Sequence, residues 1–307
     1  TKIMSKICIT GGTGLIGRRL TKLLSEKGHD IIILSRSKGA SNGNLQYAQW
    51  NIKNGTIDAD AVRSCDAVIH LAGAGVADKR WTAKRKEELL NSRTKSSALL
   101  VDILKQDKGR VKTVVSSSAI GWYGPDKGGN AFVETDPAYS DFLGETCKLW
   151  EESISPVEAM GIRLVKLRTG IVLSNEGGAL KEFKKPLRFG LASILGSGTQ
   201  MISWIHIDDM CRMFMHALEH TTAKGVYNAV APYPVSNKEL TLRLAKKMRG
   251  NAFITVPVPS FVLKLVLGEM SIEVLKSTTV SAEKIQQTGF QFLYPAIDAA
   301  LNELITS

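Results

Sequence analysis

The chain has 307 residues, 44% hydrophobic and 22% charged, a composition typical of a folded globular protein rather than a disordered or fibrous one. No apolar run reaches the roughly eighteen residues of a membrane-spanning helix, and the four cysteines form no Cys-x-x-Cys pair, which argues against a zinc site or a disulfide framework. These two features lead us to expect no membrane partner and a cytoplasmic location. The formal net charge of +11 is spread along the chain without a nucleic-acid motif, so we expect a small-molecule partner and no nucleic acid.

The first half of the chain alternates strand and helix patterns. Predicted strands cover residues 6–10, 30–34, 45–50, 67–71, 112–116 and 163–173, and predicted helices cover 15–26, 83–105 and 142–160. Strands that alternate with helices are typical of βαβ units, in which the strands are parallel. The sequence therefore predicts an α/β fold with a doubly wound parallel sheet of the Rossmann type.

The pattern loosens beyond Ser174 into glycine-rich connections. A helix is predicted at about 208–219, an amphipathic run at 261–275 and a closing helix at 295–305. We predict a dinucleotide-binding domain over 1–174, to which later segments return, a substrate-side region over 175–250 and a small C-terminal domain over 251–307. The apolar run at 261–267 is expected to face the core rather than a membrane or a partner.

Three glycines follow the first predicted strand at Gly-x-x-Gly-x-x-Gly spacing, directly before the first helix. A pyrophosphate binds against bare backbone N–H groups at a helix N-terminus, where a Cβ would block its approach. An incidental turn is the alternative. The motif predicts a dinucleotide site made by Gly11, Thr13, Gly14, Leu15, Ile16 and Gly17.

The end of the second strand indicates which dinucleotide is bound. Ser35 and Arg36 stand there, and Arg36 is nineteen residues beyond Gly17, where an NAD site usually has an acidic residue for the ribose 2′-hydroxyl. An arginine can instead make paired, charge-assisted hydrogen bonds to a 2′-phosphate. We therefore predict NADP(H) in preference to NAD(H), with a solvated basic turn as the alternative.

Further candidate residues lie at later strand ends, because ligands of doubly wound sheets bind beyond the carboxyl ends of the strands. Small residues after the fourth strand let the backbone pack near a ribose or the nicotinamide. A long helix then carries Arg93 and Glu88, which could reach the cofactor or form a solvated charged face. The additional cofactor candidates are Leu71, Ala72, Gly73, Glu88, Arg93 and Val172.

Segments 117–124 (Ser-Ser-Ala-Ile-Gly-Trp-Tyr-Gly), 149–151, 168–173, 177–180, 196–198 and 203–209 together resemble the epimerase family proteins. These belong to the extended and atypical branch of the short-chain dehydrogenase/reductase superfamily, which also contains the nucleotide-sugar epimerases. The resemblance covers nearly the whole chain. Residues 251–298 are similar to the small C-terminal domain of unknown function that the group carries.

The resemblance implies a catalytic serine or threonine, a tyrosine that acts as general acid/base, and a lysine four residues later that lowers the tyrosine pKa. The Tyr-x-x-x-Lys pair is missing from this chain. One alignment places Leu143 and Cys147 at its positions, and a shift by one residue places Gly144 and Lys148 there.

The remaining catalytic candidates are a serine and a substitute tyrosine. By resemblance Ser118 matches the serine that holds the substrate oxygen, with Ser117 next. Tyr123, five residues after Ser118, could replace the missing acid, although it also matches a tyrosine that is usually structural; Tyr139 is a second alternative.

No metal is predicted. His206 with Asp208 and Asp209 resembles a ligand trio, but a helix start explains the aspartates as caps. The chain is interpreted as an NADP(H)-binding oxidoreductase or nucleotide-sugar epimerase, with an unidentified small-molecule substrate. The alternative is a non-catalytic protein that senses NADP(H), and a homodimer is left open.

Overall fold

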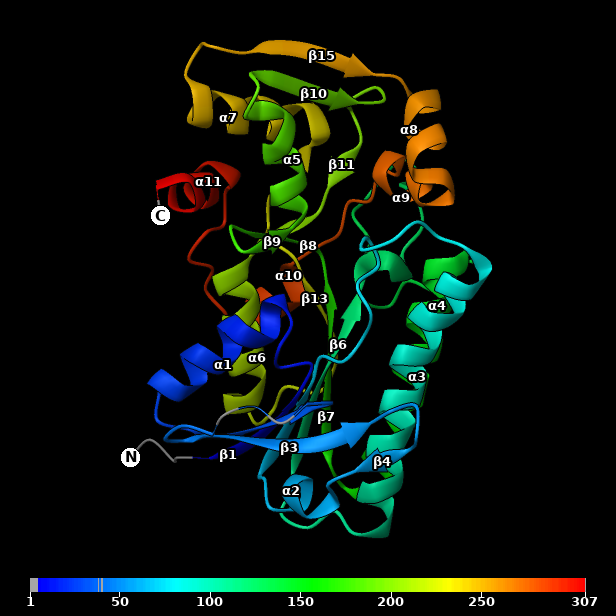
Figure 1. Cartoon of the computed structure of the whole chain (residues 1–307), viewed down its shortest axis with the longest axis vertical. Coiled ribbons are helices and arrows are strands. Elements are labelled where there is room, and N and C mark those ends of the chain that lie inside the picture. The colour runs from blue at the N-terminus through cyan, green and yellow to red at the C-terminus, as the bar shows by residue number, and fades with distance from the viewer. Residues whose placement is uncertain (1–4, 38, 40, 307) are drawn as a thin grey trace.

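Eight strands form one twisted sheet in the lower part of the molecule (Figure 1). They are β1 (Lys6–Thr10), β2 (Asp30–Ser35), β3 (Leu45–Asn51), β4 (Thr56–Ile57), β5 (Ala67–His70), β6 (Thr113–Ala119), β7 (Arg163–Thr169) and β13 (Gly225–Ala229). Their order is β13-β7-β6-β5-β1-β2-β3-β4, and every pair is parallel except β3 with β4. The order reverses between β1 and β5, where open α/β sheets bind ligands. The predicted fold class is confirmed.

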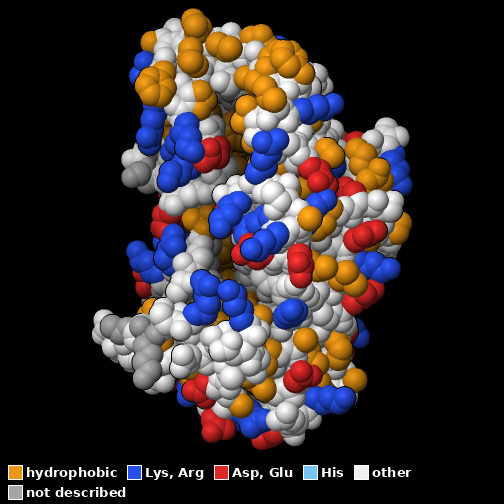
Figure 2. All heavy atoms as spheres, turned by 45° about the vertical axis from the view of Figure 1, so that its right-hand side comes forward, with side chains coloured by type: hydrophobic (Ala, Val, Ile, Leu, Met, Phe, Trp, Pro, Cys, Tyr) orange, Lys and Arg blue, Asp and Glu red, His pale blue; other side chains and the backbone are white. Residues whose placement is uncertain are grey.

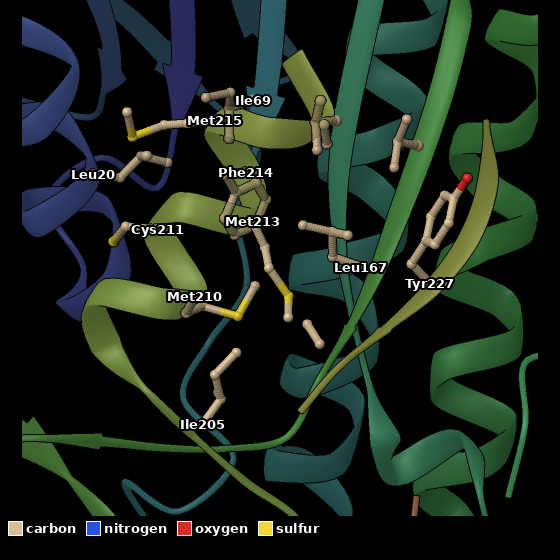
Figure 3. Close-up of a cluster of buried hydrophobic side chains, with 14 of the residues drawn as sticks. Leu20, Ile69, Leu167, Ile205, Met210, Cys211, Met213, Phe214, Met215 and Tyr227 are labelled. Carbon is tan, nitrogen blue, oxygen red and sulfur yellow. The ribbon is translucent and has the colours of Figure 1, made fainter. Parts of the chain in front are cut away.

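The computed structural model describes residues 5–37, 39 and 41–306. Helices cover both faces of the sheet: α1 (Leu15–Glu26) and α6 (Ile207–Glu219) pack on one face, and α2 (Ala59–Arg63), α3 (Ala83–Gln106) and α4 (Phe142–Ile154) on the other. In Figure 3, Met213 and Phe214 of α6 lie between the helix and the strands, beside Leu167. Burying each such side chain contributes about 2 kcal/mol. Within the described part, no helix is both long and apolar enough to span a membrane.

A smaller lobe stands above the sheet in Figure 1. Its strands form three small sheets: β12 (Trp204–His206) with β8 (Ile171–Ser174) and β9 (Gly177–Gly178), β10 (Leu191–Leu195) with β15 (Ile254–Val258), and β11 (Met201–Ile202) with β14 (Val235–Ser236). Its helices are α5 (Ala179–Leu187), α7 (Asn237–Arg249), α8 (Ser260–Leu267), α9 (Ser271–Leu275) and α11 (Ile297–Thr306). The helix α10 (Glu283–Gln287) lies against β13. An apolar cluster made by α5, α7 and α11 holds the lobe together.

Three of the longer predicted elements are divided or shortened in the structure. The strand expected at 163–173 divides at Gly170 into β7 and β8, because the chain passes there from the large sheet into the upper lobe, where β8 pairs with β12. The backbone approach at this point requires glycine, since a Cβ on Gly170 would lie 2.6 Å from the Ser203 carbonyl oxygen. The helix expected at 142–160 ends at Ile154 and continues as a 3₁₀ turn, since Pro156 has no N–H to donate. The run at 261–275 breaks at Gly268, whose φ is 62°.

The expectation that residues 261–267 face the core is wrong. Only Leu263 of α8 is buried, whereas Phe261 is 70% exposed, Leu265 75% and Val266 64%. Hydrophobicity without a clear period does not say whether an apolar helix has a core to pack against. Only the side of α8 that carries Leu263 packs against the lobe, and the other sides of the helix are exposed to solvent.

Candidate functional site

The chain turns sharply between β1 and α1. Gly11 has a φ of 69°, and a Cβ there would lie 2.8 Å from the backbone carbon of Leu71. A Cβ on Gly17 would lie 2.3 Å from the Gly11 carbonyl oxygen, so the first turn of α1 packs directly on the loop. Glycine is therefore required at both positions by close backbone packing. The exposed Gly14 starts the helix and leaves its end open.

The N-terminus of α1 has the properties of an anion site. Among the described residues no side chain caps it, and its first turn contains no acidic residue. The amides of Leu15, Ile16 and Gly17 therefore keep their capacity to donate, and the helix dipole adds positive potential. Thr13 is exposed beside this end of the helix. These residues fit the pyrophosphate of a dinucleotide.

Arg36 directly follows β2, whose strand is the neighbour of β1 in the sheet. Its side chain is exposed and makes no ion pair within residues 5–37, 39 and 41–306. The Ser35 hydroxyl accepts the amide of Ser37 at 3.4 Å, which forms the bend that follows the strand. An unpaired guanidinium at this sheet edge has the charge and the exposure that a 2′-phosphate requires.

A buried hydrogen-bond chain fixes the loop after β5. The Thr10 hydroxyl oxygen accepts the amides of Leu71 and Ala72 at 3.1 and 3.2 Å, so its proton is donated to His70 Nδ1 at 2.8 Å. His70 Nε2 then carries the proton and donates to the Ser97 hydroxyl at 3.0 Å. Burial lowers the pKa of His70 to about 4, so the ring is neutral. The chain holds this loop against the β1–α1 turn.

Two residues of α3 have different environments. Arg93 is buried, donates to the carbonyl oxygens of Leu89 and Ala74 at 2.9 and 3.0 Å, and packs its side chain against Gly73. Arg93 therefore holds the segment that follows β5 against helix α3. Glu88 is 56% exposed and pairs with Arg85 at 2.7 Å, and Arg85 in turn donates to the Gly75 carbonyl oxygen beyond β5.

The serines lie inside a strand rather than beyond it. β6 continues to Ala119, past the predicted end at 116, and pairs Ser118 with Arg168 of β7. The Ser118 hydroxyl, 1% exposed, donates to Glu151 Oε1 at 2.7 Å, and the Ser117 hydroxyl donates to the Ser118 carbonyl oxygen at 3.4 Å. The expected position of both serines at an open strand end is therefore corrected, because the strand extends as far as its partner β7 does.

Glu151 and Arg168 form a buried ion pair that links the serine to the tyrosine. Arg168 donates to Glu151 from Nε at 2.8 Å and from Nη2 at 3.1 Å, and both side chains are more than nine-tenths buried. Its Nη1 donates to the Tyr123 hydroxyl at 3.0 Å, and Tyr123 donates to Asn228 Oδ1 at 2.8 Å. Burial raises the pKa of Tyr123 to about 12. The phenol is thus held in a structural network with its proton committed.

The structure distinguishes the two alignments of α4. A Cβ on Gly121, just after β6, would lie 3.2 Å from Leu143 Cβ and 3.6 Å from Cys147 Sγ, so these two face the strand end. Lys148 is 57% exposed and pairs with Glu152 on the outer side, and Gly144 packs on the Tyr139 backbone. Burial raises the pKa of Cys147 to about 12. Leu143 and Cys147 therefore present an apolar side chain and a neutral thiol towards the end of β6, whereas Lys148 lies on the outer side of α4.

The residues of the candidate metal trio bind other partners. Arg19 donates to both oxygens of Asp208, at 2.6 and 2.9 Å. Asp209 accepts from Arg212 and from two backbone amides, and His206 Nε2 lies 2.8 Å from Glu303. No group of three potential ligands with metal geometry is found in the described part of the chain.

The upper lobe approaches the N-terminus of α1. Gly178 packs between Val172 of β8 and Leu15 of α1. A Cβ on Gly178 would lie 3.4 Å from the Val172 carbonyl oxygen and 3.3 Å from a methyl group of Leu15. Figure 2 shows a hollow between the two lobes, with Lys and Arg side chains along its rim. The structure therefore brings together the β1–α1 turn, the loop after β5 and Val172, with Arg36 at the adjacent strand end.

Sequence reasoning missed the two buried polar networks. The sequence pattern places Glu151 and Arg168 within segments that resemble the family and assigns no role to His70. The available signal was a charged or polar residue within an apolar strand or helix face, since such a residue needs a buried partner. Arg168 directly follows Leu167 in β7, and His70 ends the apolar strand β5.

Known proteins share this architecture. Residues 7–229 match the model of the NAD dependent epimerase/dehydratase family, and residues 258–304 match a domain of unknown function, DUF1731. The epimerase family protein YfhF of Bacillus subtilis is 35% identical over 300 residues, which are 97% of each chain. An epimerase family protein of Staphylococcus saprophyticus is 36% identical over 305 residues, 98% of this chain and 100% of its own.

Two solved structures are also similar. The human epimerase family protein SDR39U1 (isoform 2) with NADPH has a TM-score of 0.85 at 30% identity, over 98% of this chain and 99% of that chain. The nucleoside-diphosphate sugar epimerase from Corynebacterium glutamicum has a TM-score of 0.79 at 28% identity, over 99% of this chain and 58% of that chain.

Proposed function

Because the chain belongs to the NAD dependent epimerase/dehydratase family, we propose that it is an NADP(H)-dependent oxidoreductase or epimerase acting on a hydroxyl or carbonyl group. The observation that carries the proposal is the uncapped N-terminus of α1 with the exposed Arg36 at the adjacent strand end. The similar human protein with NADPH supports the same cofactor. The nicotinamide would supply the hydride.

The residues have separate tasks in this proposal. The amides of Leu15, Ile16 and Gly17 bind the pyrophosphate, and Arg36 binds the 2′-phosphate. The loop at 71–73, held by Thr10 and His70 and backed by Arg93, borders the site beyond β5. The Ser118 and Tyr123 network keeps the sheet edge rigid, so that the cofactor meets a preformed surface.

Replacing Arg36 with alanine should weaken NADPH binding about tenfold to a hundredfold and leave NADH binding nearly unchanged, because only NADPH has the 2′-phosphate that a charged hydrogen bond would hold. Nicotinamide fluorescence titrations with both dinucleotides measure the two affinities. Arg110→Ala, an exposed arginine at the opposite edge of the sheet, is the matched control and should change neither. Equal loss of both affinities, or of neither, would contradict the assignment.

A second candidate function is a non-catalytic protein that senses NADP(H). The observation that favours it is that Leu143 and Cys147, which the family resemblance aligns with the proton-transfer residues, face the end of β6 in place of a tyrosine and a lysine. This hypothesis predicts that NADPH binds tightly, that none of it is oxidised, and that no epimerisation occurs across a panel of nucleotide sugars and simple carbonyl compounds. Turnover that falls in Arg36→Ala in proportion to its NADPH affinity would exclude the sensor and support the enzyme.

A further inference from the structure

The outer end of the upper lobe exposes apolar side chains that the proposed function does not use. We call this surface the lobe tip; its apolar members are Phe189, Leu191, Ile254, Phe261, Leu265 and Val266. Phe189 is 81% exposed, and α8 contributes the last three. The strands β10 and β15 pair Leu191 with Ile254, and Pro259 leads directly from the other end of β15 into α8, so the two apolar groups lie at opposite ends of one strand at the top of Figure 1. Figure 2 shows hydrophobic side chains gathered there.

Cations surround these apolar groups. Arg188 is exposed next to Phe189 in the chain, and Arg249 Nη2 lies 3.7 Å from where a Cβ on Gly190 would be. Lys246 and Lys247 are exposed in the same last turn of α7 as Arg249, and Lys264 is exposed between Phe261 and Leu265 on α8. None of the five makes an ion pair with another described residue. Residues 179–206 and 231–276 contain eleven Lys and Arg but only four Glu and no Asp. These two segments, which leave out β8, β9 and α11, therefore carry an excess of positive charge.

The composition of the lobe tip favours one kind of partner. A second copy would bring two surfaces with the same positive charge together, which opposes association. Protein interfaces are depleted of lysine at their cores, whereas Lys264 stands in the middle of the apolar part of α8. Exposed Phe and Leu flanked by Lys and Arg are the combination that lies in the headgroup region of an anionic bilayer.

We propose that the lobe tip docks the protein onto anionic phospholipid membranes. Phe261, Leu265 and Phe189 enter the boundary between headgroups and acyl chains, and the lysine and arginine side chains extend to the lipid phosphates. The protein lies on the surface and does not span the bilayer. Composition alone gave the opposite expectation, because an average over the chain does not show that apolar and basic residues meet at one end of the fold.

Cosedimentation of the full chain with vesicles tests the proposal. Vesicles of phosphatidylcholine with about 30% phosphatidylglycerol should bind the protein, and vesicles of phosphatidylcholine alone should not. The double variant Phe261→Ser with Leu265→Ser should reduce binding at least about tenfold. Lys246→Gln and Lys247→Gln should each reduce it about fivefold. Leu149→Ser, at an exposed leucine of α4, is the matched control and should bind like the wild type.

Three results would overturn the proposal: no binding to anionic vesicles, equal binding to both vesicle types, or binding unaffected by the lobe-tip variants. Sedimentation velocity measures the oligomeric state in a separate experiment. A dimer that is lost in the Phe261→Ser and Leu265→Ser variant, without vesicle binding by the wild type, would assign the surface to a second copy instead. Because these side chains are exposed, thermal melting should show that the variants remain folded.

Discussion

Replacing Glu151 with alanine is expected to lower the free energy of unfolding by about 3 to 5 kcal/mol, because it leaves a buried guanidinium without its counter-charge. Arg168 is 2% exposed and would lose two hydrogen bonds at once, while the Ser118 hydroxyl would lose its acceptor. Urea unfolding at neutral pH, followed by far-ultraviolet circular dichroism, gives the difference directly.

The same helix offers the control. Glu152 pairs with Lys148 at 3.9 Å, and both side chains are 57% exposed, so Glu152→Ala should change stability by no more than about 0.5 kcal/mol. The double variant Glu151→Leu with Arg168→Met should cost less than the sum of the two single changes, since it removes both charges together. A loss below about 1 kcal/mol in Glu151→Ala would contradict the view that this pair holds the sheet edge.

Acidification should destabilise the protein through His70. Its folded pKa of about 4 is below the ordinary value of 6.5, because burial disfavours the charged ring. Between these two pH values the unfolded chain binds more protons than the folded one, so stability rises with pH in this window. The contribution of the neutral His70 ring to the free energy of unfolding is about 3 kcal/mol. It is complete above pH 6.5 and falls as the pH drops towards 4.

The variant His70→Gln isolates this effect. An amide can accept from Thr10 and donate to Ser97, as the neutral ring does, but it does not titrate. The variant should be less stable than the wild type at pH 7.5, and the difference should shrink or reverse as the pH approaches 4.5. Urea unfolding at several pH values measures how the free energy of unfolding changes with pH in the wild type and in the variant. Parallel slopes would show that His70 does not govern acid stability.

Both predictions concern residues that act behind the candidate site. Glu151 and Arg168 fix the end of β6 and Tyr123, and His70 fixes the loop that follows β5. A site for a large dinucleotide benefits from a surface that is formed before the ligand arrives, because ordering it afterwards would reduce the affinity. NADPH titrations of the Glu151 and His70 variants therefore also test whether a rigid sheet edge at the ends of β5 and β6 increases the affinity for NADPH.

Much of the fold followed from the sequence. Strand β1 and helix α1 begin and end where they were predicted, because a short β-branched strand, a glycine turn and a 3.6-residue apolar period are all local patterns. The glycine spacing predicted the β1–α1 turn, and Arg36 lies exposed at the adjacent strand end. These features depend on the backbone and on near neighbours in the chain.

Tertiary structure alone decided the environments of Ser118, Tyr123, Cys147 and α8. The serine and the tyrosine look like candidate catalysts in the sequence, but Glu151 and Asn228, 33 and 105 residues away, bind their hydroxyl groups. The sequence of helix α8 predicts a core element, yet no further layer of the described structure covers it. The physical reason is the same in each case: burial and hydrogen-bond partners come from segments distant in sequence, whereas helix periods and glycine turns are set within a few residues.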